Sequence, residues 1–555
     1  MSADGIALAP HSSIALPSGP VVFVIMDGVG VGTGDKFDAV HAAHTPTLDL
    51  LREEHLYRTL YAHGTRVGLP SNGDMGNSEV GHNILGAGRI FDQGAKSVDK
   101  AIASGTAWEG PWVELVEQVI TKQSTLHLLG LLSDGGVHSN MTHLFALVEQ
   151  AHKQDVKKVR LHLLTDGRDV PDKTAEKYVE AVETHLAKIN ADGEFDYRIA
   201  SGGGRMVTTM DRYDADWRIV ERGWNAHVLG TARAFSSATQ AITTLRDERP
   251  GISDQLLEPF TVCDEAGAPV GAIHDHDAVV LFNFRGDRAI EICQAFSAGD
   301  NFAQFDRQRV PDVLFAGMML YDGDLAIPER YLVAPETVSN TISQYIAATG
   351  LTQFACAETQ KYGHVTYFWN GNRSDKFDDA TETYLEIPSD LVPFDERPWM
   401  KSAETADAII AAIVDGNDRF IRANFASGDM VGHTGSVRGT TIAVEAVDLA
   451  LARILPAIKA AHGCLIVTAD HGNADDMVER DKAGEALFDG EGVPRWRTSH
   501  SLNPVPFYVA DFSGRNPHIA QGLDDAGLAN VAATLIEVLG YTAPVEYEPS
   551  LIRWD

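Results

Sequence analysis

The chain of 555 residues is long enough for two or more domains, and its 44% hydrophobic and 22% charged residues are ordinary for a globular protein in water. With 78 acidic against 45 basic residues the formal net charge is -33, which argues against binding to nucleic acid or to anionic membranes. An anionic substrate would therefore need a local cluster of Arg and Lys.

The cysteines and the apolar segments indicate the cellular compartment in which we expect the protein. Four cysteines show no CxxC pairing and no regular spacing, which favours reduced structural thiols over disulfides or zinc ligation. No stretch approaches the ~20 apolar residues of a membrane span. Residues 1–20 lack the basic start and apolar core of a secretion signal. We expect a cytoplasmic protein, without a membrane or nucleic-acid partner, that works as a monomer.

Short apolar runs, each followed by a polar loop, predict buried strands along the chain. These runs are residues 21–26, 126–132, 159–164, 197–200, 278–282, 420–425 and 464–467. Segments with apolar residues at helical spacing lie between the runs, at 142–152, 174–189, 403–414 and 441–460. Strands that alternate with helices predict an α/β fold with mainly parallel sheets.

Asp27 directly follows the first run, where an open α/β sheet gathers its ligands. From this residue alone, a turn aspartate before Gly28 is an equally good interpretation.

The segment 71–82, SNGDMGNSEVGH, is polar and rich in glycine, and we expect a loop there. Its one useful nucleophile is Ser78, whose hydroxyl is protonated at neutral pH and needs a base or a metal ion to react. No histidine immediately beside it looks placed as a base, and the GxSxG context of an esterase is missing. A metal ion is therefore the better candidate for activating Ser78.

Loops between residues 130 and 290 carry basic side chains after predicted strands. Their candidate residues are His138 in DGGVHS, Arg168 and Asp169 in DGRDV, Arg205 and Arg212 in SGGGRMVTTMDR, and Arg285 and Arg288 in NFRGDR. A single arginine of this kind is more often a surface residue. Five in corresponding positions within an acidic protein indicate an anion site, since guanidinium binds multi-oxygen anions in a bidentate way.

Loops after residue 425 carry residues of the metal-ligating type instead. They hold Asp429 and His433 in ASGDMVGH, Asp470 and His471 in TADHGNAD, and His500 in TSHSLNP. A spacing of four places Asp429 and His433 on one face if that segment is helical. Carboxylate, imidazole and hydroxyl ligands without thiolate suit Mn²⁺, Mg²⁺, Co²⁺ or Zn²⁺, and ligand type does not choose among them.

Taken together, these segments resemble the metal-binding and nucleophile signature of the cofactor-independent (2,3-bisphosphoglycerate-independent) phosphoglycerate mutases, within the alkaline phosphatase superfamily. The motifs run from position 27 to position 500 and so cover nearly the whole chain. The chain length and the long spacer between HGN and TSH resemble the plant and trypanosomatid branch rather than the shorter bacterial forms.

The resemblance implies a two-domain architecture. An alkaline-phosphatase-like discontinuous domain, residues 1–92 and 333–555, would bind the metals, and an inserted α/β transferase domain, residues 93–332, would bind the substrate. Crossings near 89–93 and 331–336 would serve as hinges.

The resemblance also assigns site residues. Asp429, His433 and His500 would hold one divalent ion, and Asp27, Ser78, Asp470 and His471 the other, with Mn²⁺ expected and Co²⁺, Mg²⁺ or Zn²⁺ as alternatives. Substrate would be bound by His138, Arg168, Asp169, Arg205, Arg212, Arg285, Arg288 and Lys361. Asp169 would orient the glycerate hydroxyls and move a proton. Lys361, by itself an ordinary turn lysine, would stabilise the transferring phosphoryl group.

The implied activity is that of an isomerase of glycolysis and gluconeogenesis. It would interconvert 3-phosphoglycerate and 2-phosphoglycerate through a phosphoserine at Ser78, without 2,3-bisphosphoglycerate, while the glycerate stays trapped. One alternative is a phosphatase of the same superfamily, in which water reaches the phosphoserine first. Another is a non-catalytic metal-dependent binding protein, against which the intact nucleophile and ligand set count.

Overall fold

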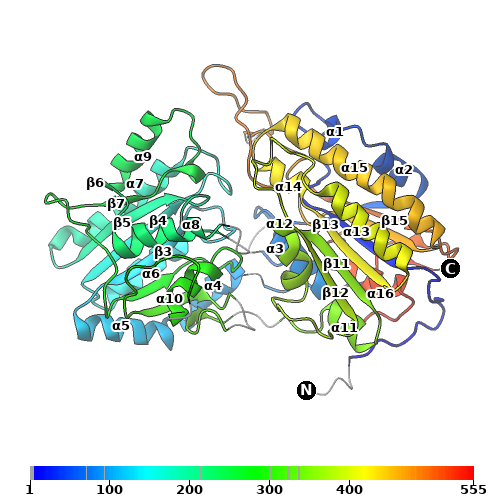
Figure 1. Ribbon diagram of the computed structural model, residues 1–555, viewed down its shortest axis with the longest axis horizontal. Helices are drawn as coiled ribbons and strands as arrows, with labels where there is room; N and C mark the ends of the chain where they lie inside the picture. Colours follow the sequence, from blue (N-terminus) through cyan, green and yellow to red (C-terminus); the bar gives the residue numbers. More distant parts are fainter. Residues whose placement is uncertain are drawn as a thin grey trace. The chain divides into compact units, whose positions relative to one another are not determined.

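The computed structural model describes residues 6–69, 72–92, 94–211, 216–299, 302–321, 326–334, 338–481 and 483–554. The chain forms two compact units, Met1–Gln93 with Thr337–Asp555, and Gly94–Glu336 (Figure 1). Each unit has its own sheet and its own hydrophobic core. The predicted crossing between 332 and 333 would cut strand β10, Tyr331–Val333, which pairs with the sheet of the second unit.

The first unit is built from both ends of the chain. Its seven-stranded sheet has the order β12-β11-β13-β1-β14-β15-β2. The strands are β1 Val21–Met26, β2 Leu56–Leu60, β11 Gln353–Glu358, β12 Glu382–Ile387, β13 Phe420–Phe425, β14 Cys464–Thr468 and β15 Val505–Asp511. A small second sheet pairs β16 His518–Ile519 with β17 Ile552–Arg553.

The helices of this unit lie between those strands along the chain. They are α1 Ala39–Ala42, α2 Pro46–Glu54, η1 Gly64–Val67, α3 Ser78–Ala87, α11 Ile342–Ala348, α12 Thr359–Gly363, η7 His364–Phe368, α13 Ser402–Asp415, α14 Ser427–Gly432, α15 Val437–Ala460 and α16 Asn530–Val538. Helix α15 buries apolar residues at helical spacing and packs beside α13 (Figure 1).

Strand register explains where a site can form in the first unit. All six residues of β1 are buried, and β1 lies between β13 and β14 in parallel. Met26 stands opposite Phe425, and Ile25 stands opposite Thr468. The carboxyl ends of these three strands therefore meet at one edge, which brings the loops after residues 26, 425 and 468 together.

The second unit is a separate α/β layer structure. Its eight-stranded sheet has the order β10-β9-β8-β3-β4-β5-β7-β6 and is parallel except for the β5–β7 pair. Its strands are β3 Leu126–Leu132, β4 Lys158–Thr165, β5 Asp196–Gly204, β6 Arg233–Phe235, β7 Phe260–Val262, β8 Ala278–Leu281, β9 Leu314–Met319 and β10 Tyr331–Val333.

Its helices are α4 Gly94–Ser104, η2 Thr106–Trp108, α5 Pro111–Lys122, α6 Met141–Lys153, α7 Ala175–Ile189, η3 Asn190–Asp192, α8 Trp217–Trp224, η4 Asn225–Leu229, α9 Ala238–Glu248, η5 Asp254–Leu256 and α10 Ile290–Ser297. Leu132 of β3 stands opposite Thr165 of β4, which stands opposite Gly204 of β5. The arginine-bearing loops that follow these strands therefore share one edge of the sheet.

The predicted strands and helices are confirmed, with ends that differ by a few residues. The prediction of a loop throughout 71–82 is wrong in its second half, because helix α3 begins at Ser78. Asn77 is the reason, since its side chain accepts a hydrogen bond from the Val80 N–H at 3.1 Å and caps the helix. Glycine and polar content alone did not reveal this start.

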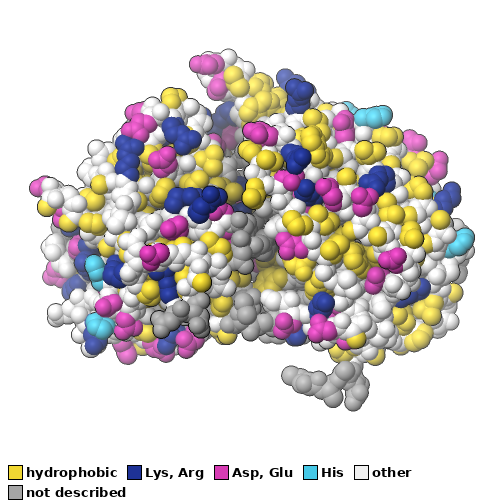
Figure 2. Space-filling model, in the orientation of Figure 1, with side chains coloured by type: hydrophobic (Ala, Val, Ile, Leu, Met, Phe, Trp, Pro, Cys, Tyr) yellow, Lys and Arg dark blue, Asp and Glu magenta, His cyan; other side chains and the backbone are white. Residues whose placement is uncertain are grey.

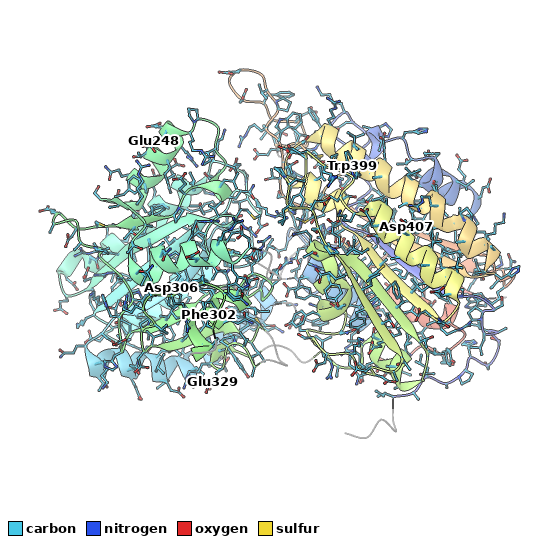
Figure 3. The ribbon with its side chains drawn as sticks, viewed as in Figure 1. Glu248, Phe302, Asp306, Glu329, Trp399 and Asp407 are labelled. Carbon is cyan, nitrogen blue, oxygen red and sulfur yellow. The ribbon has the colours of Figure 1, made fainter. Side chains whose placement is uncertain are left out.

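One face of the molecule can be compared for the distribution of its charged side chains. On the face shown in Figure 2, acidic and basic side chains are interspersed over each unit. Asp407, labelled in Figure 3, pairs with Arg453 and links α13 to α15 at the surface, where such a pair adds little stability. Among the described residues, the helices are all too short or too polar to cross a membrane.

Candidate metal centre and active site

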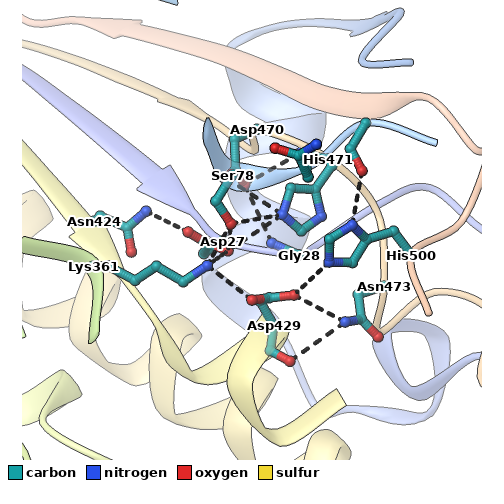
Figure 4. Close-up of polar contacts among 12 residues, drawn as sticks. Asp27, Gly28, Ser78, Lys361, Asn424, Asp429, Asp470, His471, Asn473 and His500 are labelled. Carbon is teal, nitrogen blue, oxygen red and sulfur yellow. Dashed lines mark hydrogen bonds and ion pairs between the residues drawn. The ribbon is translucent and has the colours of Figure 1, made fainter. Parts of the chain in front are cut away.

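Ser78 is the first residue of α3 and is buried. Its hydroxyl donates a hydrogen bond to Asp27 Oδ1 at 3.2 Å and lies 3.0 Å from Nε2 of His471 (Figure 4). The ammonium group of Lys361 donates a short hydrogen bond to the same oxygen. The Ser78 hydroxyl thus lies among groups from three other segments of the chain.

Lys361 lies in α12, which follows the buried strand β11. Its Nζ donates to Asp27 Oδ1 at 2.6 Å and to Asp429 Oδ2 at 2.8 Å, and its side chain is only 2% exposed. A lysine on an exposed turn would not lose its hydration in this way. Its position is that of a fixed positive charge beside the serine oxygen.

Asp429, His433 and His500 form the other half of the cluster. Helix α14 places Asp429 and His433 on one face, with Nε2 of His433 3.0 Å from Asp429 Oδ1. Nε2 of His500 lies 3.2 Å from the same carboxylate oxygen and 3.1 Å from Nε2 of His433. Ligand atoms of Asp429, His471 and His500 lie within 4.8 Å of one another, as do those of Asp27, Asp470 and His471.

The imidazole orientations suit metal ligation. Nδ1 of His500 lies 2.7 Å from the Gly76 carbonyl, and Nδ1 of His433 lies 2.5 Å from the Thr498 carbonyl. Because a carbonyl only accepts, each Nδ1 carries a proton, and each ring turns its Nε2 inward, as metal-ligating histidines do. The two Nε2 atoms lie 3.1 Å apart and face one carboxylate oxygen, so a cation bound there could be held by all three atoms.

The buried charges of this cluster also favour a bound cation. Three buried carboxylates, those of Asp27, Asp429 and Asp470, surround one ammonium, so two negative charges remain uncompensated when all three are ionised. Oδ2 of Asp470 has two histidine nitrogens close to it, Nδ1 of His82 at 3.3 Å and Nε2 of His471 at 3.6 Å. Burying unpaired charge is costly, and divalent cations would remove that cost.

The acids are not equivalent. Burial and the neighbouring Asp470 raise the pKa of Asp27 to about 7, although Lys361 opposes this. Burial would also raise the pKa of Asp429, but His433 and Lys361 hold it well below its ordinary range. The same buried cluster therefore shifts the pKa values of these two acids in opposite directions.

Several supporting residues were missed by reasoning from sequence. Asn424 donates to Asp27 Oδ2 at 2.7 Å and lies 3.1 Å from Nε2 of His82, whose Nδ1 lies 2.7 Å from the Ser78 carbonyl. Asn473 donates to Asp429 Oδ1 at 2.9 Å. A signal existed for Asn424: a polar amide inside the fully buried strand β13 must find partners.

The second unit brings its predicted arginines to one edge of its sheet as buried side chains. Arg205 donates to Asp166 Oδ1 at 2.9 Å and, over a short distance, to Asp169 Oδ2. Asp166 also accepts hydrogen bonds from the backbone N–H groups of Arg168 and Asp169, at 3.1 and 3.0 Å. Asp166 was missed although it directly follows a strand, as Asp27 does.

The remaining predicted substrate residues follow β3 and β8. Arg285 Nε donates to Asp287 Oδ1 at 2.9 Å, and His138 Nδ1 lies 3.7 Å from that oxygen. Arg288 Nη1 donates to the Met210 carbonyl at 2.6 Å. Arg212 lies outside the described residues. The other predicted arginines, Arg168, Arg205, Arg285 and Arg288, are at most 8% exposed, which is unusual for surface arginines.

Residues 19–543 match the family model described as the Metalloenzyme superfamily. The 2,3-bisphosphoglycerate-independent phosphoglycerate mutase of Trypanosoma brucei brucei is 50% identical to this chain over 552 residues, which cover 99% of both chains.

The chain belongs to the 2,3-bisphosphoglycerate-independent phosphoglycerate mutase family.

Two further comparisons agree with this assignment. The mutase 1 of Arabidopsis thaliana is 48% identical over 549 residues, 97% of each chain. A solved structure of Leishmania mexicana phosphoglycerate mutase, at low cobalt concentration, has a TM-score of 0.97 and 51% identity, covering 99% of this chain and 100% of that one. The expected two-domain α/β fold of the mutase family is thereby confirmed, and the plant and trypanosomatid resemblance is borne out.

Proposed function

We propose that this chain interconverts 3-phosphoglycerate and 2-phosphoglycerate, with Ser78 as the temporary acceptor of the phosphoryl group. The observation that carries the proposal is the environment of the Ser78 hydroxyl, which contacts Asp27, Lys361 and His471 within a buried cluster of metal-ligating side chains. The relatives that share its full length are named for this activity.

The first step forms the bond between Ser78 Oγ and phosphorus and breaks the bond between phosphorus and the glycerate oxygen. The hydroxyl proton points to Asp27 Oδ1, which can accept it. Lys361 holds a positive charge beside the same oxygen and favours its anionic form. The amino terminus of α3 adds favourable partial charge for the phosphoryl group carried by its first residue.

The metal-ligating residues of the proposed site fall into two sets. Asp429, His433 and His500 would hold one divalent ion and Asp27, Ser78, Asp470 and His471 a second one. We propose Mn²⁺ as the ion, with Co²⁺, Mg²⁺ or Zn²⁺ as alternatives. When bound, such ions supply Lewis-acid stabilisation of the oxygens at phosphorus. A ring nitrogen of His471 lies within 4.8 Å of ligand atoms from both sets, so this residue could link the two sites.

Retention of glycerate is the proposed task of the second unit. Arg168, Arg205, Arg285 and Arg288 supply guanidinium groups for the carboxylate and the phosphate, and Arg212 and His138 complete the proposed set. Asp169 would accept a proton from one glycerate hydroxyl and return it to the other. The phosphoryl group then leaves Ser78 for the second hydroxyl, and the serine regains its proton.

The remaining assignments are part of the same proposal. Residues of the first unit would carry the metals and those of the second unit the substrate, with the crossings near 89–93 and 331–336 as hinges, although Gln93 and residues 335–336 lie outside the described residues. We propose that the protein is a cytoplasmic monomer. Its four cysteines are free thiols, and three of them are buried.

Intact-mass analysis tests the covalent step directly. After brief mixing of the protein with Mn²⁺ and 3-phosphoglycerate and acid quenching, we expect a mass increase of one phosphoryl group, located at Ser78 by peptide sequencing. Release of inorganic phosphate faster than formation of 2-phosphoglycerate would contradict the mutase and favour a phosphatase. A phosphoryl group on another residue would show that the nucleophile is misassigned.

Removal of divalent ions should abolish activity and lower stability. Dialysis against a chelator leaves the buried carboxylates uncompensated, so we expect activity to fall at least about 100-fold and to return with Mn²⁺ or Co²⁺. The free energy of unfolding should increase by about 2.7 kcal/mol when the concentration of added ion reaches 100 times its Kd. Asp429→Asn is the control, since it removes a ligand and should blunt the thermal response. Undiminished activity after exhaustive chelation would contradict the metal assignment.

A further inference from the structure

A continuous chain of hydrogen bonds crosses the interior of the second unit. It runs through six buried side chains, in the order Asp277, His127, His162, Ser201, His227 and Thr209. The successive separations are 3.1 Å from Asp277 Oδ2 to His127 Nε2, 2.9 Å from His127 Nδ1 to His162 Nε2, 2.6 Å from His162 Nδ1 to Ser201 Oγ, 2.7 Å from Ser201 Oγ to His227 Nδ1, and 2.9 Å from His227 Nε2 to Thr209 Oγ1.

This chain of hydrogen bonds crosses neighbouring strands toward the edge of the sheet where the arginine-bearing loops lie. His127 lies near the amino end of β3, His162 in the middle of β4 and Ser201 in the second half of β5. His227 lies in η4, a π-helical turn after α8. Thr209 lies beyond β5 in the loop that also carries Arg205, and the carbonyl of the next residue, Met210, accepts a hydrogen bond from Arg288.

Asp277 determines the direction of every hydrogen bond in the chain. Two backbone N–H groups, of Thr125 and His274, donate to its carboxylate at 2.8 Å. Burial acts to raise the pKa of Asp277, but these bonds and His127 outweigh it and the pKa is lowered. The carboxylate therefore accepts from Nε2–H of His127, whose Nδ1 must then accept from the next ring.

The donor and acceptor roles of the remaining groups follow in the same way. His162 donates from Nε2, so its Nδ1 accepts the Ser201 hydroxyl proton, and Ser201 Oγ accepts from Nδ1–H of His227. Burial lowers the pKa of His227 to about 3 and that of His162 well below its ordinary value, so both rings are neutral as this pattern requires. Nε2 of His227 is left as an acceptor for the Thr209 hydroxyl.

Thr209 is a residue that needs such support. Its φ is +68°, a left-handed conformation that a β-branched residue adopts only under constraint. Its N–H donates to the Ile219 carbonyl at 2.8 Å, and a Cβ at Gly223 would lie 2.1 Å from its hydroxyl oxygen. The turn is thus packed closely against α8, where the absence of a side chain at Gly223 leaves space for the Thr209 hydroxyl.

The backbone conformation of Thr209 determines the direction in which the carbonyl of Met210 points. The carbonyl of Met210 accepts from Arg288 Nη1 at 2.6 Å, and Arg288 is one of the arginines proposed to bind substrate. If Thr209 relaxed to an ordinary φ, the peptide that follows it would rotate, and this carbonyl would turn away from the guanidinium group. The position of Arg288 therefore depends on the backbone at Thr209.

We propose that the chain from Asp277 to Thr209 is a positioning device, which locks the strained turn at Thr209 and thereby holds Arg288 in place for the anionic substrate. In this role its six members act on the substrate only through Arg288. The inference rests on the proposed function in one respect, namely that Arg288 binds phosphoglycerate.

Thr209→Val tests the device at its substrate end. The variant keeps the β-branched shape but removes the hydroxyl, and we expect KM for phosphoglycerate to rise roughly tenfold, equal to about 1.4 kcal/mol, with a smaller change in kcat. Thr209→Ser keeps the hydroxyl and should restore KM to within about twofold. Thr208→Val is the matched control, because the neighbouring Thr208 hydroxyl is buried without a hydrogen-bond partner among the described residues.

His227→Asn provides a second, independent variant. Asparagine can still donate to Ser201, but its shorter side chain has no acceptor atom where Nε2 of His227 meets Thr209, so it should raise KM as Thr209→Val does. The double variant should show no further increase, since both changes remove the same bond. A Thr209→Val protein that folds and keeps KM within twofold of the wild type would overturn the proposal.

Ring ¹⁵N shifts of labelled histidine give a readout that does not depend on turnover. We expect His227 as the neutral tautomer protonated at Nδ1, and His127 and His162 as neutral tautomers protonated at Nε2. An imidazolium or the opposite tautomer at His227 would overturn the chain. Wild-type protein that does not interconvert phosphoglycerates would refute the proposed function alone, and calorimetric binding of phosphoglycerate to the Thr209 variants would then still decide the role of Arg288.

Discussion

Ser78→Ala should lower kcat by at least about 10⁴-fold, because alanine leaves no oxygen at the position from which we propose that phosphorus is attacked. Lys361, Asp27 and Asn424 keep their contacts with one another, so the fold and substrate binding should change little. The measurement is the interconversion of the two phosphoglycerates at saturating substrate, together with intact mass after substrate addition, which should show no phosphoryl group.

Ser402→Ala is a matched control for the loss of a buried serine. Ser402 lies in α13 of the same unit, and its hydroxyl is 3.4 Å from the Ser427 hydroxyl. It should leave kcat within about twofold of the wild type. Activity of Ser78→Ala close to that of the wild type would refute a phosphoserine at this position, whatever the control shows.

Lys361→Met should reduce kcat roughly 10²- to 10³-fold, with a smaller effect on KM. Methionine fills a similar volume, but the charge beside the Ser78 oxygen and the hydrogen bonds to Asp27 and Asp429 are lost. The loss falls on kcat because that charge stabilises the serine oxygen and the transferring group while bonds at phosphorus change. Steady-state kinetics at several substrate concentrations separates the two constants.

Lys401→Met removes a lysine of the same unit that pairs with Asp390 and Glu404 near the surface. Its side chain is 17% exposed, so its loss should change neither constant by more than about twofold. If Lys361→Met instead raised KM and left kcat unchanged, Lys361 would bind substrate without stabilising the transition state.

The strands and helices could be predicted because their patterns are local. Residues 21–26 form a continuous apolar run, which suits a strand buried on both faces, and β1 has these bounds. The start of α3 could not be predicted from composition, since two glycines, Gly73 and Gly76, closely precede the Asn77 cap that decides it. Local capping geometry outweighed the average polarity of the segment.

The type of each site residue could also be predicted, but its partners could not. Asp429 and His433 share a helix face because of their spacing, and the structure places their atoms 3.0 Å apart. The contacts of Asn424 with Asp27 and His82 depend on strand order, which no spacing in the sequence shows. The chain of histidines was missed for the same reason, because His127, His162 and His227 belong to separate elements.

What the sequence by itself determined is therefore the family, the alternation of strands and helices, and the chemical types of the groups that follow each strand. Only the tertiary structure decided that Lys361, 334 residues from Asp27, donates to its carboxylate, and that Thr209 adopts a left-handed turn behind Arg288. The physical reason is that propensity and periodicity act between near neighbours in the chain, whereas hydrogen bonds across a sheet depend on the order and register of strands. Those are set when the whole core packs.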